Sequence, residues 1–226
     1  MSAQSYTGDV QVGGPADVRE LPGLPIRKLA VGEMANNAYL LIDSGTGPGT
    51  GQALLIDAAA EPEALLALIG AADLRTVVTT HGHWDHHGAL PQVVEATGAQ
   101  TVAHPADAAD LPLPVTRPVE HGDTVPVGDH ALEVVHLRGH TPGSIALVWR
   151  GPEGSGTHVF TGDSLFPGGV GNTQQDPERF ASLIDDVETR LFGALPDDTW
   201  VYPGHGKDTT IGTERPHLAE WRERGW

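Results

Sequence analysis

The chain has 226 residues, a formal net charge of −17 and no cysteine. A strongly acidic chain repels phosphate groups, and its few basic residues are scattered, so we exclude nucleic acid as a partner. No apolar run approaches the length of a membrane span, and the polar N-terminus lacks the pattern of a signal peptide, so we expect a cytoplasmic protein. The lack of cysteine excludes disulfides, zinc–thiolate sites and thiol nucleophiles. The chain has 12 histidines but only 2 lysines, which directs attention to metal binding.

The pattern of apolar residues predicts one α/β domain over residues 25–226, preceded by an N-terminal arm or edge extension over residues 1–24. Short apolar runs bounded by turn residues predict strands over residues 26–31, 38–42, 53–56, 75–80, 101–103, 124–127, 132–137, 144–149, 157–161 and 199–202. The Gly- and Pro-containing segment 44–49 is typical of a hairpin turn between two of them.

Apolar residues at helical spacing predict helices over residues 61–71, 88–97 and 177–192, the last with Asp176 as its N-cap. Residues 206–226 are polar and are expected to be partly helical. Strands in blocks, with helices between and after them, favour a layered architecture in which helices lie outside paired sheets.

The segment from Thr80 to His87 reads Thr-His-Gly-His-Trp-Asp-His-His and follows a predicted buried strand. Alternate side chains of an extended chain share a face, so His81 and His83 can reach one cation. Asp85 and His86 come where the chain turns toward the next helix, so they can face a second point nearby. Imidazole and carboxylate groups suit zinc, iron or manganese. The spacing therefore predicts a metal site at the end of this strand.

The His-X-His-X-Asp-His run resembles the signature of the metallo-β-lactamase fold superfamily, and three later segments resemble that family's further motifs in the family's order. They are Gly139-His140-Thr141-Pro142-Gly143-Ser144, Thr161-Gly162-Asp163-Ser164-Leu165-Phe166 and Tyr202-Pro203-Gly204-His205-Gly206. The resemblance extends over roughly residues 26–212. It implies an αββα four-layer sandwich with metals at the rim between its two sheets.

The resemblance also implies the ligands of two divalent metal ions, zinc in the first instance, with iron or manganese as alternatives. The implied ligands are His81, His83 and His140 for one metal, Asp85, His86 and His205 for the other, and Asp163 for both. A hydroxide between the metals would attack a carbonyl carbon, with Asp85 and Asp163 as the catalytic residues. The expected activity is therefore that of a binuclear metallo-hydrolase.

Four further residues are candidates around this site. Asp57 ends a core strand, where the family often keeps an acid that supports the ligand loop, although a turn cap is an alternative. Asn172 and Lys207 stand where glyoxalase II has a lysine and a tyrosine, and these departures argue against glutathione as the thiol. Arg138 and Lys207 could contact a substrate carboxylate, with an ordinary surface role as the alternative.

The ligand set and the short loop 168–171 resemble the glyoxalase II branch, which implies a small-molecule thioester as the substrate. A thiolate with a pKa near 8.5 leaves without a dedicated acid. One alternative is a lactonase, which would need Tyr39 or Tyr202 near the metals as a proton donor. The other is a persulfide dioxygenase with one iron held by two histidines and a carboxylate. The sequence leaves the metal, the acyl group, the thiol and the oligomeric state open.

Overall fold

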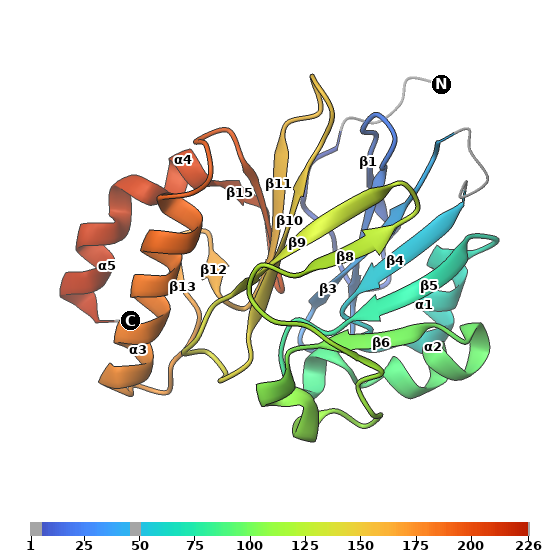
Figure 1. The fold of residues 1–226 in the computed structure, drawn as a ribbon, viewed down its shortest axis with the longest axis horizontal. Helices are drawn as coiled ribbons and strands as arrows, with labels where there is room; N and C mark the ends of the chain where they lie inside the picture. Colours follow the sequence, from blue (N-terminus) through green and yellow to red (C-terminus); the bar gives the residue numbers. More distant parts are fainter. Residues whose placement is uncertain (1–5, 46–50, 226) are drawn as a thin grey trace.

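The structure is a computed structural model that describes residues 6–45 and 51–225. Two β-sheets face each other, with helices on both outer sides (Figure 1). In spatial order the first sheet contains β1 (Asp17–Arg19), β2 (Ile26–Val31), β3 (Asn36–Ile42), β4 (Gln52–Ile56), β5 (Asp73–Val78), β6 (Gln100–Ala103) and β7 (Arg117–Pro118). The second contains β15 (Thr209–Thr210), β14 (Trp200–Pro203), β11 (Thr157–Gly162), β10 (Ile145–Arg150), β9 (His130–His136) and β8 (Thr124–Val127).

A separate short hairpin pairs β12 (Leu165–Phe166) with β13 (Gly169–Val170). The helices are α1 (Pro62–Ile69), α2 (Leu90–Thr97), α3 (Pro177–Asp186), α4 (Ile211–Glu214) and α5 (Leu218–Arg224). Short 3₁₀ turns cover Trp84–His86, Pro105–Asp110 and Arg215–His217. Among the described residues, no helix has the length and apolar character needed to cross a membrane.

Three apolar clusters hold the layers together. Side chains that alternate along one strand belong to different clusters. In β3, Tyr39 and Leu41 belong to the cluster between the two sheets, whereas Ala38 and Leu40 belong to the cluster under α1 and α2. Side chains of a strand point alternately to its two faces, so one strand supplies two cores. A third cluster joins the second sheet to α3 and to Trp221 of α5. These layers confirm the predicted αββα sandwich.

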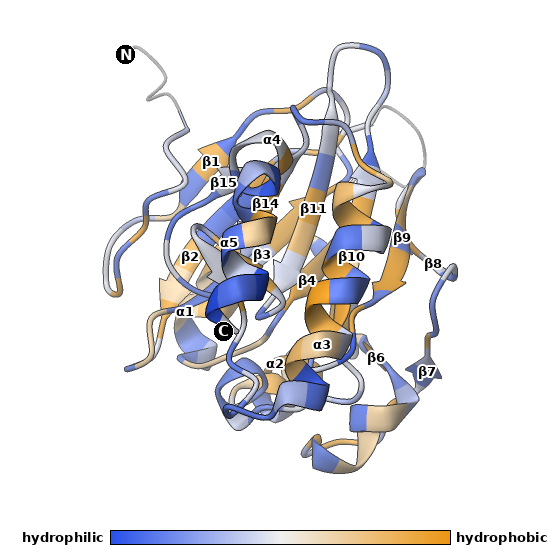
Figure 2. Ribbon diagram, turned by 90° about the vertical axis from the view of Figure 1, so that its left-hand side faces the viewer, coloured by the Kyte–Doolittle hydropathy of each residue, from blue (hydrophilic) through white to orange (hydrophobic). Residues whose placement is uncertain are grey.

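The amphipathic helix predicted over residues 177–192 is α-helical only as far as Asp186. Residues Val187–Phe192 form a π-helical turn, in which the Gly193 amide donates to the Glu188 carbonyl at 2.8 Å. The wider turn keeps Val187, Leu191 and Phe192 buried. The Asp176 cap is confirmed, because its carboxylate accepts hydrogen bonds from the amides of two first-turn residues of α3. Figure 2 shows polar and apolar positions alternating around this helix.

The predicted antiparallel hairpin is formed by β3 and β4, which pair with each other. Part of its turn, residues 46–49, lies outside the described residues.

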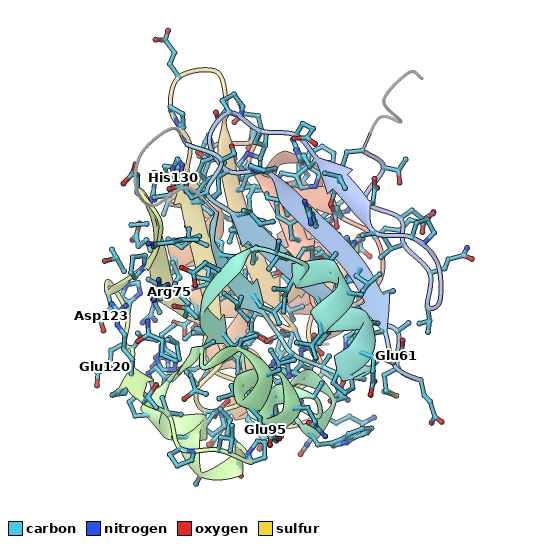
Figure 3. The ribbon with its side chains drawn as sticks, turned by 90° about the vertical axis from the view of Figure 1, so that its right-hand side faces the viewer. Glu61, Arg75, Glu95, Glu120, Asp123 and His130 are labelled. Atoms are coloured by element: carbon cyan, nitrogen blue, oxygen red, sulfur yellow. The ribbon has the colours of Figure 1, made fainter. Side chains whose placement is uncertain are left out.

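Within the segment predicted as an arm or edge extension, β1 extends the first sheet beside β2. Buried Lys28 holds this segment, since its Nζ donates to the Gly8 carbonyl at 2.7 Å and pairs with Asp208 at 2.6 Å. On the outer surface, exposed Glu61 directly precedes α1 and exposed Glu95 lies on α2 (Figure 3).

Buried His158 gives the fold a predicted sensitivity to acid. Its Nε2 donates to the Ser155 carbonyl at 2.9 Å, and in the neutral ring its Nδ1 accepts from the Tyr202 hydroxyl at 3.0 Å. Burial lowers the pKa of His158 from 6.5 to about 4. The unfolded chain therefore binds the proton more tightly, so this contribution to stability is complete above pH 6.5 and is lost as the pH falls toward 4.

We expect His158→Gln, which cannot titrate, to remove this part of the pH dependence. The difference in free energy of unfolding between the metal-free wild type and the variant should shrink by about 3 kcal/mol between pH 7 and pH 4. Urea unfolding of both proteins across this range measures it. A difference that stays constant with pH would show that His158 is not held neutral.

Candidate metal centre

The predicted ligands come from loops that follow strand ends at one rim of the sandwich. His81, His83, Asp85 and His86 follow β5, and His140 lies between β9 and β10. Asp163 directly follows β11, and His205 follows β14. Strands of both facing sheets end here, so their following loops converge although they are far apart in sequence.

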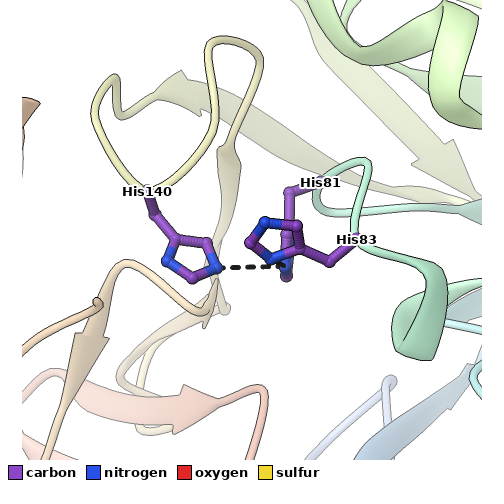
Figure 4. A group of neighbouring side chains, drawn as sticks. All are labelled: His81, His83 and His140. Atoms are coloured by element: carbon purple, nitrogen blue, oxygen red, sulfur yellow. Dashed lines mark hydrogen bonds between the residues drawn. The ribbon is translucent and has the colours of Figure 1, made fainter. Parts of the chain in front are cut away.

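His81, His83 and His140, here named the first ligand group, bring their ring nitrogens together (Figure 4). His81 Nε2 lies 3.1 Å from His83 Nδ1 and 3.3 Å from His140 Nε2. Two of the rings come from the loop after β5, and the third comes from the loop between β9 and β10, on the opposite sheet. His81 and His140 are buried and His83 is half-buried, so the group faces a point at the rim.

Asp85, His86 and His205, here named the second ligand group, form a similar triangle. His86 Nε2 lies 3.3 Å from His205 Nε2 and 3.6 Å from Asp85 Oδ2. His205 Nε2 lies 3.5 Å from the same carboxylate oxygen. His86 is fully buried at the base of the group, whereas the other two residues are half-buried.

Asp163 lies between the two groups. Its Oδ1 is 3.4 Å from His86 Nε2, and its Oδ2 is 3.6 Å from His140 Nε2 and 3.5 Å from His205 Nε2. Oδ1 is buried and has no hydrogen-bond partner among the described residues. A buried carboxylate oxygen without a donor is unfavourable, and a cation beside it would remove that cost.

The donor spacing fits metal coordination. In a tetrahedral zinc site with bonds of about 2.0–2.1 Å, neighbouring ligand atoms lie about 3.3–3.4 Å apart. The distances within both groups, from 3.1 to 3.6 Å, surround that value. Ring nitrogens at this separation with lone pairs directed at one another repel, unless a proton or a cation lies between them. The residues present therefore fit two divalent metal ions.

Four of the five histidines in the two ligand groups have their second ring nitrogen held by an oxygen atom outside these groups. His140 Nδ1 donates to the Asn172 carbonyl at 2.8 Å, and His205 Nδ1 donates to the Met34 carbonyl at 3.0 Å. His81 Nδ1 and His86 Nδ1 contact the Thr80 hydroxyl at 3.1 Å and the Asp57 carboxylate at 2.8 Å respectively. An Nδ1–H donated outward leaves the Nε2 lone pair for a metal, so these partners select the ligating tautomer.

When no metal is bound, burial and neighbouring charges shift the histidine pKa values of the two ligand groups in opposite directions. Burial holds the pKa of His81 well below its usual value and lowers that of His140 to about 4. Burial also opposes the charged form of His86, but the carboxylates of Asp57 and Asp163 outweigh it and raise its pKa to about 10. For His205, hydrogen bonds to carboxylates outweigh burial and raise the pKa to about 9. At neutral pH, metal binding to the second group must therefore displace protons.

Asp57, the predicted supporting acid, contacts a ligand and Thr80, the residue that directly precedes His81. Its Oδ2 lies 2.8 Å from His86 Nδ1 and accepts from the Thr80 hydroxyl at 2.8 Å, while its Oδ1 accepts from the Thr80 amide at 2.7 Å. Its backbone has a positive φ of 58°, which asparagine tolerates as well as aspartate does.

We therefore expect Asp57→Asn to fold and to weaken the second group without removing a ligand. The variant loses one acceptor oxygen and the charge beside His86, and losses of outer partners usually cost roughly 10- to 100-fold in metal affinity. Zinc titration against a competing chelator measures the change. An affinity equal to that of the wild type would show that Asp57 serves only as a turn cap.

The structure engages the three predicted substrate residues in contacts within the protein. Arg138 pairs through Nη2 with Asp186 at 2.7 Å, and exposed Lys207 pairs with Asp9 at 2.9 Å. Asn172 supports His140 through its backbone carbonyl, and its side-chain oxygen accepts from the Gln174 amide at 2.7 Å. Their roles in substrate binding stay predictions.

Sequence reasoning missed Asn36, whose Nδ2 donates to Asp85 Oδ2 at 2.8 Å. It also missed Asn37, whose Nδ2 donates to the carbonyls of Pro203 and Gly206, both at 2.9 Å, on either side of His205. Both asparagines are buried at the start of β3. Two adjacent asparagines at the start of an otherwise apolar strand were the available signal.

Comparison with known proteins identifies the family. The family model described as the metallo-beta-lactamase superfamily matches residues 31–205. The chain belongs to this superfamily, which confirms the resemblance seen in the motifs.

Three proteins of known sequence or structure are similar to this chain over most of its length. Hydroxyacylglutathione hydrolase GloC from Haemophilus influenzae is 33% identical over 183 residues, which cover 72% of this chain and 84% of that protein. The crystal structure of ETHE1 from Myxococcus xanthus is 33% identical with a TM-score of 0.73, covering 85% of this chain and 82% of that one. TTHA1623, solved in a di-iron-bound form, is 34% identical with a TM-score of 0.65, covering 83% and 96%.

Proposed function

We propose that this protein is a binuclear metallo-hydrolase that cleaves thioesters of a small thiol, with zinc as its metal. The observation that carries the proposal is the arrangement of two three-residue ligand groups around one shared carboxylate, Asp163.

Two bound divalent ions would supply Lewis acidity and would lower the pKa of bound water to roughly 7. The chain's own residues hold the geometry. Asn36 donates to Asp85 Oδ2, the oxygen that faces His86 and His205, and so holds this carboxylate in place. A cleft of 520 Å³ lies beside the first ligand group and gives the substrate access to it; its lining includes Gly82, His83, Arg138, His140 and Arg179.

The tyrosines favour a leaving group that needs no acid. The hydroxyl of Tyr39 donates to the Pro203 carbonyl at 2.7 Å, that of Tyr202 donates to His158, and that of Tyr6 donates to Asp208 at 2.5 Å. These are the chain's three tyrosines, and none directs a free hydroxyl toward the ligand groups. A thiolate leaves without such help, whereas the alkoxide of an opened lactone benefits from it.

Two similar proteins support the proposal of a two-metal thioester hydrolase. GloC is named a hydroxyacylglutathione hydrolase, and acyl thioesters of glutathione are therefore the first substrates to test. The di-iron form of TTHA1623 supports a two-metal site at 34% identity.

One second candidate is a mononuclear-iron persulfide dioxygenase, because His81 and His140 lie beside the carboxylate of Asp163. That activity needs two histidines and one carboxylate. It would leave the second ligand group without a metal, although Asp57, Asn36 and Met34 hold its three members in place. The number of bound metals and oxygen uptake with a persulfide separate the two candidates.

The test of the proposed function is metal-dependent thioester cleavage. The wild type is assayed with acyl thioesters of glutathione and of other small thiols, with thiol release followed by a chromogenic disulfide. We expect turnover that disappears after chelation and returns with zinc, manganese or ferrous iron. A fully metal-loaded protein that turns over no thioester would contradict the proposal.

A further inference from the structure

Asp107 is a buried carboxylate outside every motif that resembles the superfamily. It lies in the short 3₁₀ turn Pro105–Asp110, after β6, and only 1% of its surface is exposed. Its two oxygens receive three hydrogen bonds. Oδ2 accepts from the Gly82 amide at 2.8 Å and from the Thr141 hydroxyl at 2.6 Å, and Oδ1 accepts from the Gly143 amide at 2.6 Å.

These partners belong to the two loops that carry the first ligand group. Gly82 separates His81 from His83, and Thr141 directly follows His140. One carboxylate therefore connects both loops close to all three ligands of one metal. None of its three partners adjoins a member of the second ligand group, so its effect should be confined to the first.

Several features of the His140 loop depend on this contact. A Cβ atom at Gly143 would lie 2.7 Å from Asp107 Cγ, so only glycine allows the carboxylate to approach. Because the Thr141 hydroxyl donates to Asp107, the Ser144 hydroxyl at 2.6 Å must donate to Thr141, and it accepts in turn from the Thr141 amide at 3.1 Å. Thr141, Gly143 and Ser144 thus form one hydrogen-bonded turn that ends on Asp107.

All three groups that contact Asp107 act as donors, so the arrangement needs an acceptor at both oxygens. Ionised aspartate is an acceptor only, whereas asparagine of the same shape places an NH₂ donor against one of those partners. We propose that Asp107 is a positioning residue for the first metal, acting through His81, His83 and His140. This inference rests on the proposed ligand assignment.

The test measures zinc affinity separately at each ligand group, by competition with a chromophoric chelator. His205→Ala leaves the first group complete, and His83→Ala leaves the second complete. Adding Asp107→Asn to the His205→Ala protein should weaken zinc binding by roughly 10- to 100-fold, as expected for an outer partner of metal ligands. Adding it to the His83→Ala protein should leave zinc binding unchanged.

Two controls separate positioning from a general loss of stability. Asp43 is a buried carboxylate that accepts from the amides of Gly45 and Asp129, both at 2.7 Å, at the opposite end of β3 from Asn36. Asp43→Asn should change zinc affinity at neither group. Should Asp107→Asn fail to fold, Thr141→Val, which removes one donor to Asp107, should weaken the first group, and Thr141→Ser, which keeps the hydroxyl, should restore it.

The positioning role of Asp107 would be overturned if Asp107→Asn weakened zinc binding equally at both ligand groups, or did not weaken it at the first group. Equal affinities for Thr141→Val and Thr141→Ser would also overturn it. Failure of thioester turnover would contradict the proposed function but would not alter these binding results. A wild-type chain that binds no zinc would overturn the ligand assignment, and the role of Asp107 with it.

Discussion

Asp163→Asn should abolish two-metal binding and reduce kcat/KM by at least about 10³-fold on any thioester that the wild type cleaves. This loss exceeds the roughly 10- to 100-fold loss usual for a residue that only supports metal ligands. Asp163 is the only residue within 3.6 Å of ligand nitrogens in both groups, among the contacts of the described residues. Asparagine keeps its size but places an NH₂ group against His86 on one side or against His140 and His205 on the other. That group cannot bind a metal and brings donor hydrogens into the site.

Elemental analysis and steady-state kinetics on the same preparation check this expectation. Asp185→Asn is the matched control, since Asp185 is an exposed carboxylate on α3 that pairs with Arg222. It should retain the metal content and kcat/KM of the wild type. An Asp163→Asn protein that still holds two metals would show that the carboxylate is not shared between them.

Gly204→Ala should disrupt the centre without changing any ligand. A Cβ atom there would lie 2.1 Å from Asp163 Oδ1 and 2.8 Å from His86 Cε1. His86 cannot move away freely, because Asp57 holds it, and Gly204 is itself held by the hydrogen bond from its amide to the Gly162 carbonyl at 2.8 Å. We expect loss of two-metal binding and a destabilisation of about 1–3 kcal/mol, the range for overpacking.

Gly206→Ala, two residues away, is the control. Its Cβ would meet nothing within 4 Å, although its positive φ of 72° strains a non-glycine residue by about 1–2 kcal/mol. The two variants therefore lose comparable stability and differ in metal content, which thermal unfolding and elemental analysis measure together. Equal metal content in both variants would contradict the tight packing around Asp163.

The sequence predicted most of the fold because strand alternation and motif order are local signals. Residues 38–42 and 53–56 pair in the structure as their spacing indicated. The π-helical turn after Asp186 was not predicted, because its stripe of buried residues is the same as that of a continuous α-helix. Residues 1–24 were expected to form an arm or an edge extension, and β1 extends the edge of the first sheet. The bounds of β1 were not predicted, since three half-buried residues give too short a pattern.

The site was predictable to the extent that its residues lie in motifs. The seven ligand candidates come together, and Asp57 contacts His86. Asn36 and Asp107 were not found, because each acts on a segment distant in sequence, and no spacing relates Asp107 to Gly82 or Thr141. Arg138 was a substrate candidate from its position alone, and its pairing with Asp186 on α3 could not be read from the sequence.

Elemental analysis of protein purified without chelators or a histidine tag measures whether the centre binds two metals. We expect about two divalent metal ions per chain, as in a binuclear hydrolase. About one iron per chain, with nothing else bound, would contradict this expectation and favour oxygen chemistry at a single metal.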